Sequence, residues 1–209
     1  KENDEWAKTL ESLDNNQNNL KEIVSNLPIT GIGDSVMLGA IQNLNTQFPN
    51  GYIDAKVSRT AWKAGAILNE LNEKNMLGNP IIINLGANGD CSTACKQEIM
   101  KNCGNRKVYW LNTTNNQDTN IRLKNFASSY ANLHIIDWYT ISLGHSEYFY
   151  ADGIHLTGIG RKVYTEVIFN AIYQDYLKEF NEAKQTLIEK HNEEQKNKIT
   201  FYGNNILLN

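Results

Sequence analysis

Apolar side chains recur at alternating spacings of four and three residues near both ends of the chain. This spacing is typical of a helix that packs along one seam against another helix. The first pattern ends at Pro28, and the second runs from about Gly158 to Asn197. We expect the two helices to form an antiparallel pair; a helix-mediated dimer is the alternative, because heptads do not specify whose helix is contacted. The seam positions are Trp6, Leu10, Leu13, Gln17, Leu20, Val24 and Leu27, then Phe169, Tyr173, Tyr176, Phe180, Ala183 and Leu187.

Between these segments, short apolar runs alternate with helical patterns, which predicts an α/β fold. We expect a three-layer α/β/α sandwich around a mainly parallel, five-stranded sheet, as in flavodoxin-like proteins. The predicted regions are a helix over 1–28, an α/β domain over 29–172 and a helical extension over 173–209, whose last residues, 199–209, have no assigned structure. The predicted strands are Ile29–Ile32, Tyr52–Val57, Ile81–Leu85, Lys107–Leu111 and Leu133–Trp138, and the helices between them are Val36–Phe48, Ala61–Met76, Cys91–Cys103 and Gln117–Tyr130.

Composition excludes several classes of function. The net charge of the 209 residues is −3 and no dense basic run occurs, which argues against nucleic-acid binding. The longest apolar runs, such as Pro80–Leu85, are too short to cross a bilayer, and residues 1–10 do not resemble a signal peptide. Cys91, Cys95 and Cys103 lack a fourth zinc ligand, so we expect no metal. They predict one local disulfide with a spare thiol outside the cytosol, or three thiols inside it.

A serine, a histidine and a carboxylate stand where an α/β fold places its sites. Ser35 follows the first predicted strand in Gly33-Asp34-Ser35 and starts a helix, although such a tripeptide also serves as a simple helix cap. Asp152 and His155 lie three residues apart, just before the last helix. Serine becomes a nucleophile when a histidine takes its proton and a carboxylate orients that histidine. The three residues therefore predict a catalytic triad, and Asn88 after the central strand can donate to an oxyanion.

Three ordered blocks identify the family that residues 29–172 resemble. Gly33-Asp34-Ser35-Val36, Gly86-Ala87-Asn88-Gly89 and Asp152-Gly153-Ile154-His155-Leu156 are similar to the blocks of the SGNH (GDSL-like) hydrolase superfamily. With Asp137-Trp138-Tyr139 and Gly144-His145-Ser146-Glu147-Tyr148-Phe149, the chain resembles the extracytoplasmic domain of Gram-positive peptidoglycan O-acetyltransferases.

The resemblance implies a function and roles for residues. The domain would lie on the extracytoplasmic face of the membrane, tethered to a membrane acyltransferase domain of the same protein that delivers acetyl groups. It would move acetyl onto the C6 hydroxyl of N-acetylmuramic acid without a cofactor. Ser35 would carry the acetyl group, His155 would be the general base and acid, and Asp152 would orient it. The backbone N–H groups of Ser35 and Ser58 and the Asn88 amide would form the oxyanion hole; Ser58 replaces a glycine of the superfamily.

Two other functions use the same features. A secreted SGNH esterase would employ the same triad with water as the acceptor, and a non-catalytic wall-binding module would use the heptad helices as its contact surface. Three residues are candidates for substrate binding: Arg59 for an anionic sugar substituent, and Trp138 and Tyr139 as a sugar-stacking wall. Their alternatives are a surface ion pair for Arg59 and core packing for the two aromatic residues.

Overall fold

Five short parallel strands form one sheet in the order β2–β1–β3–β4–β5. The computed structural model describes the backbone of residues 2–206 and the side chains of residues 4–198. Thr30 of β1 pairs with Tyr52 of β2 on one side and with Ile81 of β3 on the other. The predicted parallel five-stranded sheet is therefore confirmed, with each strand four residues long. The strands are β1 Thr30–Gly33, β2 Tyr52–Ala55, β3 Ile81–Asn84, β4 Val108–Leu111 and β5 Leu133–Ile136.

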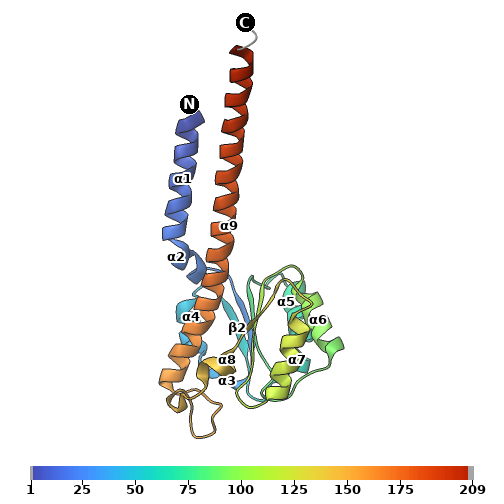
Figure 1. Cartoon of the computed structure of the whole chain (residues 1–209). Coiled ribbons are helices and arrows are strands. Elements are labelled where there is room, and N and C mark those ends of the chain that lie inside the picture. Colours follow the sequence, from blue (N-terminus) through green and yellow to red (C-terminus); the bar gives the residue numbers. More distant parts are fainter. Residues whose placement is uncertain (1, 207–209) are drawn as a thin grey trace. The chain divides into compact units, whose positions relative to one another are not determined.

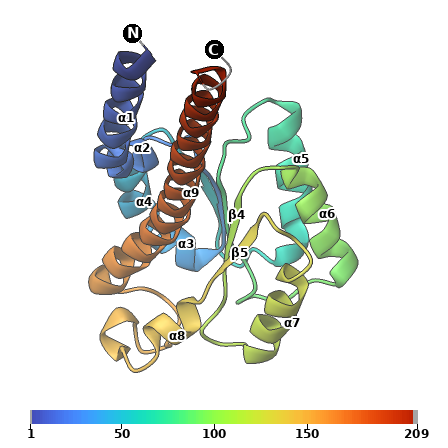
Figure 2. The ribbon, with the colours of Figure 1, turned by 45° about the horizontal axis from the view of Figure 1, so that its top comes forward.

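Helices cover both faces of the sheet, as Figures 1 and 2 show. One face carries α3 (Ser35–Gly39), α4 (Ile41–Gln47) and residues 158–172 of α9 (Gly158–Ile206). The other face carries α5 (Ala64–Glu73), α6 (Thr93–Cys103) and α7 (Gln117–Ala127). Strands β1, β3 and β4 are buried along their whole length, because helices lie on both of their faces. The three-layer sandwich is confirmed.

Several predicted boundaries differ from the structure. The predicted helix Val36–Phe48 divides at Ala40 into α3 and α4, and the predicted helix Ala61–Met76 begins as a short 3₁₀ helix, η1 (Ala61–Lys63). The last strand ends at Ile136, because the Asp137 carboxylate accepts the N–H of Thr140 and starts α8 (Trp138–Ser142). A second 3₁₀ helix, η2 (Ser146–Tyr148), was not predicted.

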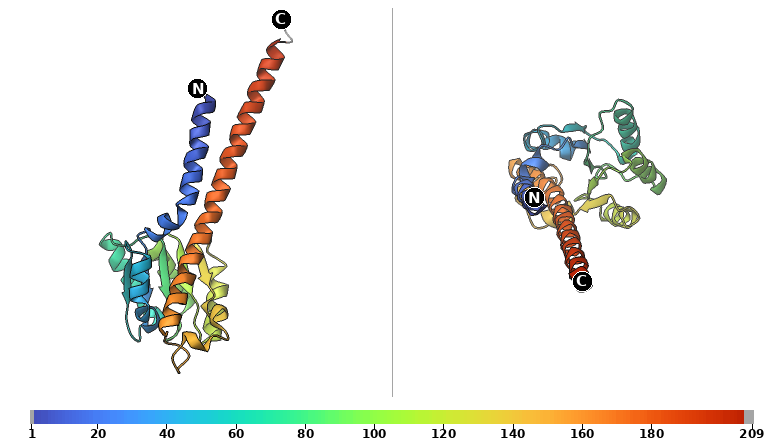
Figure 3. Two further views of the ribbon diagram at one scale, coloured as in Figure 1. Left: turned by 90° about the vertical axis from the view of Figure 1, so that its left-hand side faces the viewer. Right: turned by 90° about the horizontal axis from the view of Figure 1, so that it is seen from above.

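The chain divides into two compact units, residues 22–172 and residues 1–21 with 173–209. The second unit joins α1 (Glu2–Asn18) to the later part of α9, and Figures 1 and 3 show the two helices running in opposite directions. The antiparallel helix pair is therefore confirmed within one chain. The division at residues 28 and 172 into functional regions stays a prediction. Three contacts join α1 to the later part of α9: Gln17 Nε2 donates to Asn181 Oδ1 at 3.2 Å, Lys184 pairs with Asp14, and the rings of Trp6 and His191 stack with their centroids 4.1 Å apart.

The seams differ from the predicted ones in two places. The first helix is interrupted at Asn19, in an asparagine-rich stretch of low helix propensity, and resumes as α2 (Leu20–Ser25). Beyond Phe180, and as far as residue 198, the half-buried positions are Lys184, Ile188, His191 and Gln195, whereas the predicted Ala183 and Leu187 are exposed. A straight helix has a period of 3.6 residues, so its buried stripe drifts away from a strict heptad. The helical backbone continues to Ile206, and residues 207–209 of the unassigned tail lie outside the described residues.

Cys91, Cys95 and Cys103 are free thiols and all three are buried, so the local disulfide expected outside the cytosol is not formed. Burial raises the pKa of the Cys103 thiol to about 12, and burial beside Cys95 raises the pKa of the Cys91 thiol further. These two side chains therefore act as apolar packing groups. Among residues 2–206, no helix combines the length and apolarity that a membrane crossing requires.

Candidate active site

The junction of β1 and α3 places the predicted nucleophile at the carboxyl edge of the sheet. The last residue of β1 is Gly33. Only glycine fits at this position, because a Cβ there would lie 2.3 Å from the Cβ of Met37. Asp34 caps α3: one of its carboxylate oxygens accepts the N–H of Val36 at 2.9 Å. Ser35 is the first residue of α3, so its N–H is one of the donors that a helix start leaves without an intrahelical acceptor.

Asp152 and His155 lie on a tight loop between η2 and α9. The Asp152 Oδ1 atom accepts the N–H groups of Ile154 and His155, both at 2.9 Å. Gly153 adopts a φ of +68°, and Tyr150 N donates to the carbonyl of His155 at 2.8 Å. These local hydrogen bonds hold the loop without burying it, because the two functional side chains each remain 46% exposed.

The structure brings Ser35, His155 and Asp152 together in one hydrogen-bonded line. Ser35 Oγ lies 2.9 Å from His155 Nε2, and His155 Nδ1 lies 2.7 Å from Asp152 Oδ2. The hydrogen bond to His155 and the two backbone N–H groups lower the pKa of Asp152 to about 2. Asp152 is therefore ionised at neutral pH and holds a proton on Nδ1, which leaves Nε2 free to accept the proton of Ser35.

The three predicted oxyanion donors come from loops that follow adjacent strands. Lys56 N donates to the carbonyl of Gly33 at 3.1 Å, which ties the turn containing Ser58 to the end of β1. Asn88 Nδ2 bridges to the carbonyl of Arg59 at 3.4 Å and to Asp34 Oδ2 at 3.5 Å. Because these contacts are long, the amide is weakly held and can turn toward a developing oxyanion.

Ser58 has a backbone conformation that glycine adopts more readily than serine. Its φ is +58°, in the left-handed region, and Arg59 N closes the turn on Lys56 O at 3.3 Å. A non-glycine residue in that region is strained by roughly 1–2 kcal/mol. Serine therefore occupies this turn in spite of the strain. The Ser58 N–H stays a predicted oxyanion donor.

Sequence comparisons identify homologues of this chain. No family model matches the chain. The O-acetyltransferase OatA of Staphylococcus aureus is 31% identical over 156 residues, which cover 72% of this chain and 26% of OatA. YrhL of Bacillus subtilis, named provisionally as a peptidoglycan O-acetyltransferase, is 32% identical over 148 residues, covering 69% of this chain and 23% of YrhL. The chain is a homologue of peptidoglycan O-acetyltransferases. It spans about a quarter of the length of these relatives.

Solved structures show the same fold. The catalytic C-terminal domain of the Streptococcus pneumoniae peptidoglycan O-acetyltransferase OatA, solved with a methylsulfonyl adduct, aligns with a TM-score of 0.63 and 23% identity, covering 72% of this chain and 96% of that domain. A GDSL-like lipase from Bacteroides thetaiotaomicron aligns with a TM-score of 0.57 and 16% identity, covering 70% of this chain and 88% of the lipase. The chain therefore has the same fold as an O-acetyltransferase catalytic domain and a GDSL-like lipase.

Arg59 does not have a free guanidinium. Its Nη2 lies 2.6 Å from Asp54 Oδ1, its Nη1 donates to the Asp54 carbonyl at 2.5 Å, and the side chain is only 9% exposed. The predicted contact with an anionic sugar substituent is thus wrong for this geometry, because Asp54 occupies the guanidinium. Arg59 instead holds the turn on which Ser58 lies.

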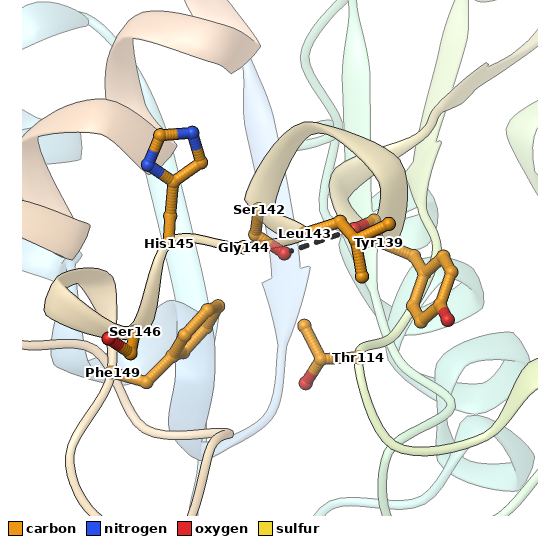
Figure 4. A pocket seen from close by; sticks show the side chains of 8 residues that line it. All are labelled: Thr114, Tyr139, Ser142, Leu143, Gly144, His145, Ser146 and Phe149. Carbon is orange, nitrogen blue, oxygen red and sulfur yellow. Dashed lines mark hydrogen bonds between the residues drawn. The ribbon is translucent and has the colours of Figure 1, made fainter.

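Trp138 and Tyr139 have different surroundings. Trp138 is 2% exposed and packs edge-on against Tyr164, so its predicted role as a sugar-stacking wall is wrong and it is a core residue. Tyr139 is half-buried and lines a hollow of about 300 Å³. Figure 4 shows the rings of Tyr139 and Phe149 on opposite sides of this hollow, with Thr114 between them and the His145 ring projecting away.

Three buried polar residues, Asp34, Asn84 and Tyr164, lie close to the nucleophile. Only Asp34 belongs to one of the sequence blocks that were recognised. Asp34 is fully buried, and loss of solvation raises the pKa of its carboxyl to about 6. Nearby, the buried Tyr164 hydroxyl donates to Asn84 Oδ1 at 2.8 Å. The sequence predicted no role for Asp34 of its own, because its burial and its contact with Asn88 depend on the packing of separate segments.

Proposed function

We propose that this domain is a surface O-acetyltransferase that moves an acetyl group through Ser35 onto a cell-wall glycan hydroxyl, the C6 hydroxyl of N-acetylmuramic acid. The observation that carries the proposal is the continuous line from Ser35 Oγ through His155 to Asp152, at 2.9 Å and 2.7 Å. The homologous O-acetyltransferases support acetyl as the transferred group.

The first step acetylates the serine. His155 Nε2 takes the proton of Ser35 as Oγ bonds to the carbonyl carbon of the acetyl donor. The resulting oxyanion accepts hydrogen bonds from the N–H groups of Ser35 and Ser58 and from the Asn88 amide. Collapse of this intermediate breaks the bond to the donor oxygen, which leaves with the proton from His155. Asp152 stabilises the imidazolium while it carries that proton.

The second step reverses these roles with a sugar hydroxyl. His155 takes the proton of the hydroxyl as its oxygen attacks the acetyl-Ser35 ester, and the oxyanion hole holds the second tetrahedral intermediate. Breaking the bond to Ser35 Oγ returns the proton to the serine and releases the acetylated sugar. We place a neighbouring sugar of the acceptor chain, and not the reacting one, at the hollow beside Tyr139. Thr114 also lines this hollow, and its Oγ1 donates at 3.1 Å to the carbonyl of Gly153 in the catalytic loop.

An esterase is the second candidate, and the exposure of the loop favours it. The His155 and Asp152 side chains are each 46% exposed, so water has access to the acetyl-serine ester unless bound glycan excludes it. The choice between transfer and hydrolysis therefore depends on the acceptor. A wall-binding module without catalysis is the third candidate.

One experiment separates these candidates. The protein is incubated with 4-nitrophenyl acetate and muropeptide oligosaccharides, and both protein and sugars are analysed by mass spectrometry. The proposal expects acetyl on Ser35 and then on sugar; acetate alone would indicate an esterase. Methylsulfonyl fluoride should label the wild type and leave Ser35→Ala unlabelled, whereas an unlabelled wild type would favour the binding module.

The arrangement of the whole protein is also part of the proposal. The chain matches about a quarter of the length of OatA and YrhL. We place it on the extracytoplasmic face of the membrane, as one domain of a longer protein whose membrane acyltransferase domain delivers the acetyl donor. Sequencing the complete gene tests this arrangement. We expect the gene to encode a longer chain with several membrane spans.

A further inference from the structure

A second cleft lies beside the turn that carries Ser58. It has a volume of about 420 Å³, and its lining includes Lys56, Ser58, Arg59 and Lys63. The turn follows β2 at one edge of the sheet, whereas Tyr139 follows β5 at the opposite edge. Ser35 follows β1, between these edges in strand order, so a ligand in this cleft approaches the nucleophile from the side of the oxyanion hole.

The cleft carries unbalanced positive charge. Arg59 is neutralised by Asp54, with which it makes an ion pair at 2.6 Å. Lys56 and Lys63 are both exposed. Among residues 4–198, neither of their ammonium groups has a hydrogen-bond or ion-pair partner. Two free cations therefore line one cleft, and such an arrangement attracts an anionic ligand.

The position of the two lysines relates them to the reaction. Lys56 N donates to the carbonyl of Gly33 at 3.1 Å, two residues before the nucleophile. Asn88 reaches the carbonyl of Arg59 on the same turn at 3.4 Å. A lysine side chain is long and flexible, so its charge can reach a substituent of a sugar whose hydroxyl is at Ser35.

An exposed aromatic residue next to these cations favours a carbohydrate over a bare anion. Trp62 lies in η1 beside Lys63, and its side chain is 58% exposed. The flat apolar face of an exposed indole suits the C–H face of a sugar ring. Trp62 does not line the cleft itself, but it directly precedes the lining residue Lys63 in η1. A glycan that extends past Lys63 can therefore contact it.

We infer that Lys56 and Lys63 bind the carboxylate of an acidic glycan acceptor while its hydroxyl lies at acetyl-Ser35. The inference rests on the proposed function and gives it a determinant of specificity: a carboxylate-bearing sugar, such as one with a lactyl ether, is preferred over a neutral N-acetylglucosamine chain. A phosphodiester wall polymer has similar anionic chemistry and provides a second arm of the test.

The test measures binding by calorimetry with three probes, independently of acetyl transfer. These are a muramic-acid oligosaccharide with free carboxylates, a chitooligosaccharide of equal length, and a glycerol-phosphate oligomer. For the double variant Lys56→Gln/Lys63→Gln, Kd for the carboxylate probe should rise about 5- to 10-fold, as expected for two exposed ion pairs, and Kd for chitooligosaccharide should change less than twofold. The charge-matched control Lys8→Gln/Lys101→Gln, altered on α1 and α6, should bind all three probes as the wild type does.

The possible results are distinguishable. Equal losses for the charged and neutral oligosaccharides, or no loss for either, would overturn the inference. A lysine-dependent preference for the phosphate oligomer over the carboxylate would overturn the assignment of carboxylate as the ligand. Failure of the wild type to acetylate any sugar would overturn the proposed function alone, because binding is measured without turnover.

Discussion

The two halves of the candidate site are held in opposite ways. The first half, residues 33–36, is built into the core: Gly33 and Asp34 are buried, and Asp34 lies beneath the nucleophile. The second half, residues 152–155, is on an exposed loop whose shape comes from hydrogen bonds within a few residues. The two carboxylates show the contrast. Burial raises the pKa of Asp34 to about 6, whereas hydrogen bonds lower the pKa of Asp152 to about 2.

This difference indicates where each half is vulnerable. A change at Gly33 or Asp34 must disturb packing, so we expect it to affect stability first. A change in residues 152–155 alters exposed side chains and hydrogen bonds within the loop, so we expect it to lower activity without unfolding the domain. A rigid nucleophile paired with an exposed base also leaves room for a bulky acceptor to approach His155.

Asp152→Asn should have the largest effect on activity. Asparagine retains an oxygen for the N–H groups of Ile154 and His155, but it cannot stabilise the imidazolium. We expect kcat for 4-nitrophenyl acetate to fall about 10²- to 10⁴-fold, while the free energy of unfolding changes by less than about 0.5 kcal/mol. Stopped-flow kinetics and urea unfolding measure both. A loss below tenfold would remove Asp152 from the triad.

Two glycine substitutions compare the halves directly. Gly33→Ala places a Cβ 2.3 Å from Met37 Cβ, and we expect a loss of about 3 kcal/mol from overpacking. Gly153→Ala meets no atom within 4 Å, and its φ of +68° costs about 1 kcal/mol. Urea unfolding of the two variants gives the values. Equal losses would contradict the distinction between a packed half and a hydrogen-bonded half.

Asp34→Asn should alter how stability depends on pH. The folded pKa is raised from 3.8 to about 6, so the stabilising contribution of the protonated form is complete below pH 3.8 and is lost as pH rises through 6. Asparagine also caps helices but cannot ionise. Relative to wild type, the variant should therefore gain about 2 kcal/mol between pH 4 and pH 7.5, measured by urea unfolding at both values. A constant difference across this range would mean that Asp34 does not titrate there.

Ser58→Gly should have the smallest effect. Glycine removes the strain of a φ of +58° but loses more backbone entropy on folding, so we expect a net change within about 1 kcal/mol. The backbone N–H is retained, and kcat should stay within about threefold of wild type. Thermal unfolding and ester hydrolysis provide the measurements. A large drop in kcat would show that the Ser58 side chain, and not its N–H, has a role.

The sequence predicted the sheet, the two helical layers and the antiparallel terminal helices, because short apolar strands and heptad spacing are periodic signals. It did not predict where the helix after β1 divides or that Trp138 starts a helix, since a cap such as Asp137 competes with strand propensity over one or two residues. Arg59 shows a second limit of sequence-based prediction. Its position after a predicted strand suggested a contact with substrate, but in the structure its guanidinium is paired with the carboxylate of Asp54 in β2.

For the site, sequence alone determined which groups can do chemistry: a serine, a histidine, a carboxylate and an asparagine in ordered motifs next to predicted elements. Tertiary structure alone decided that His155 Nε2 is 2.9 Å from Ser35 Oγ across 120 residues of chain, and that Asp34 is buried while Asp152 is not. The physical reason is that distance and solvation depend on which segments pack together. Hydrogen-bond geometry, pKa shifts and free surface charge such as that of Lys56 and Lys63 follow from that packing.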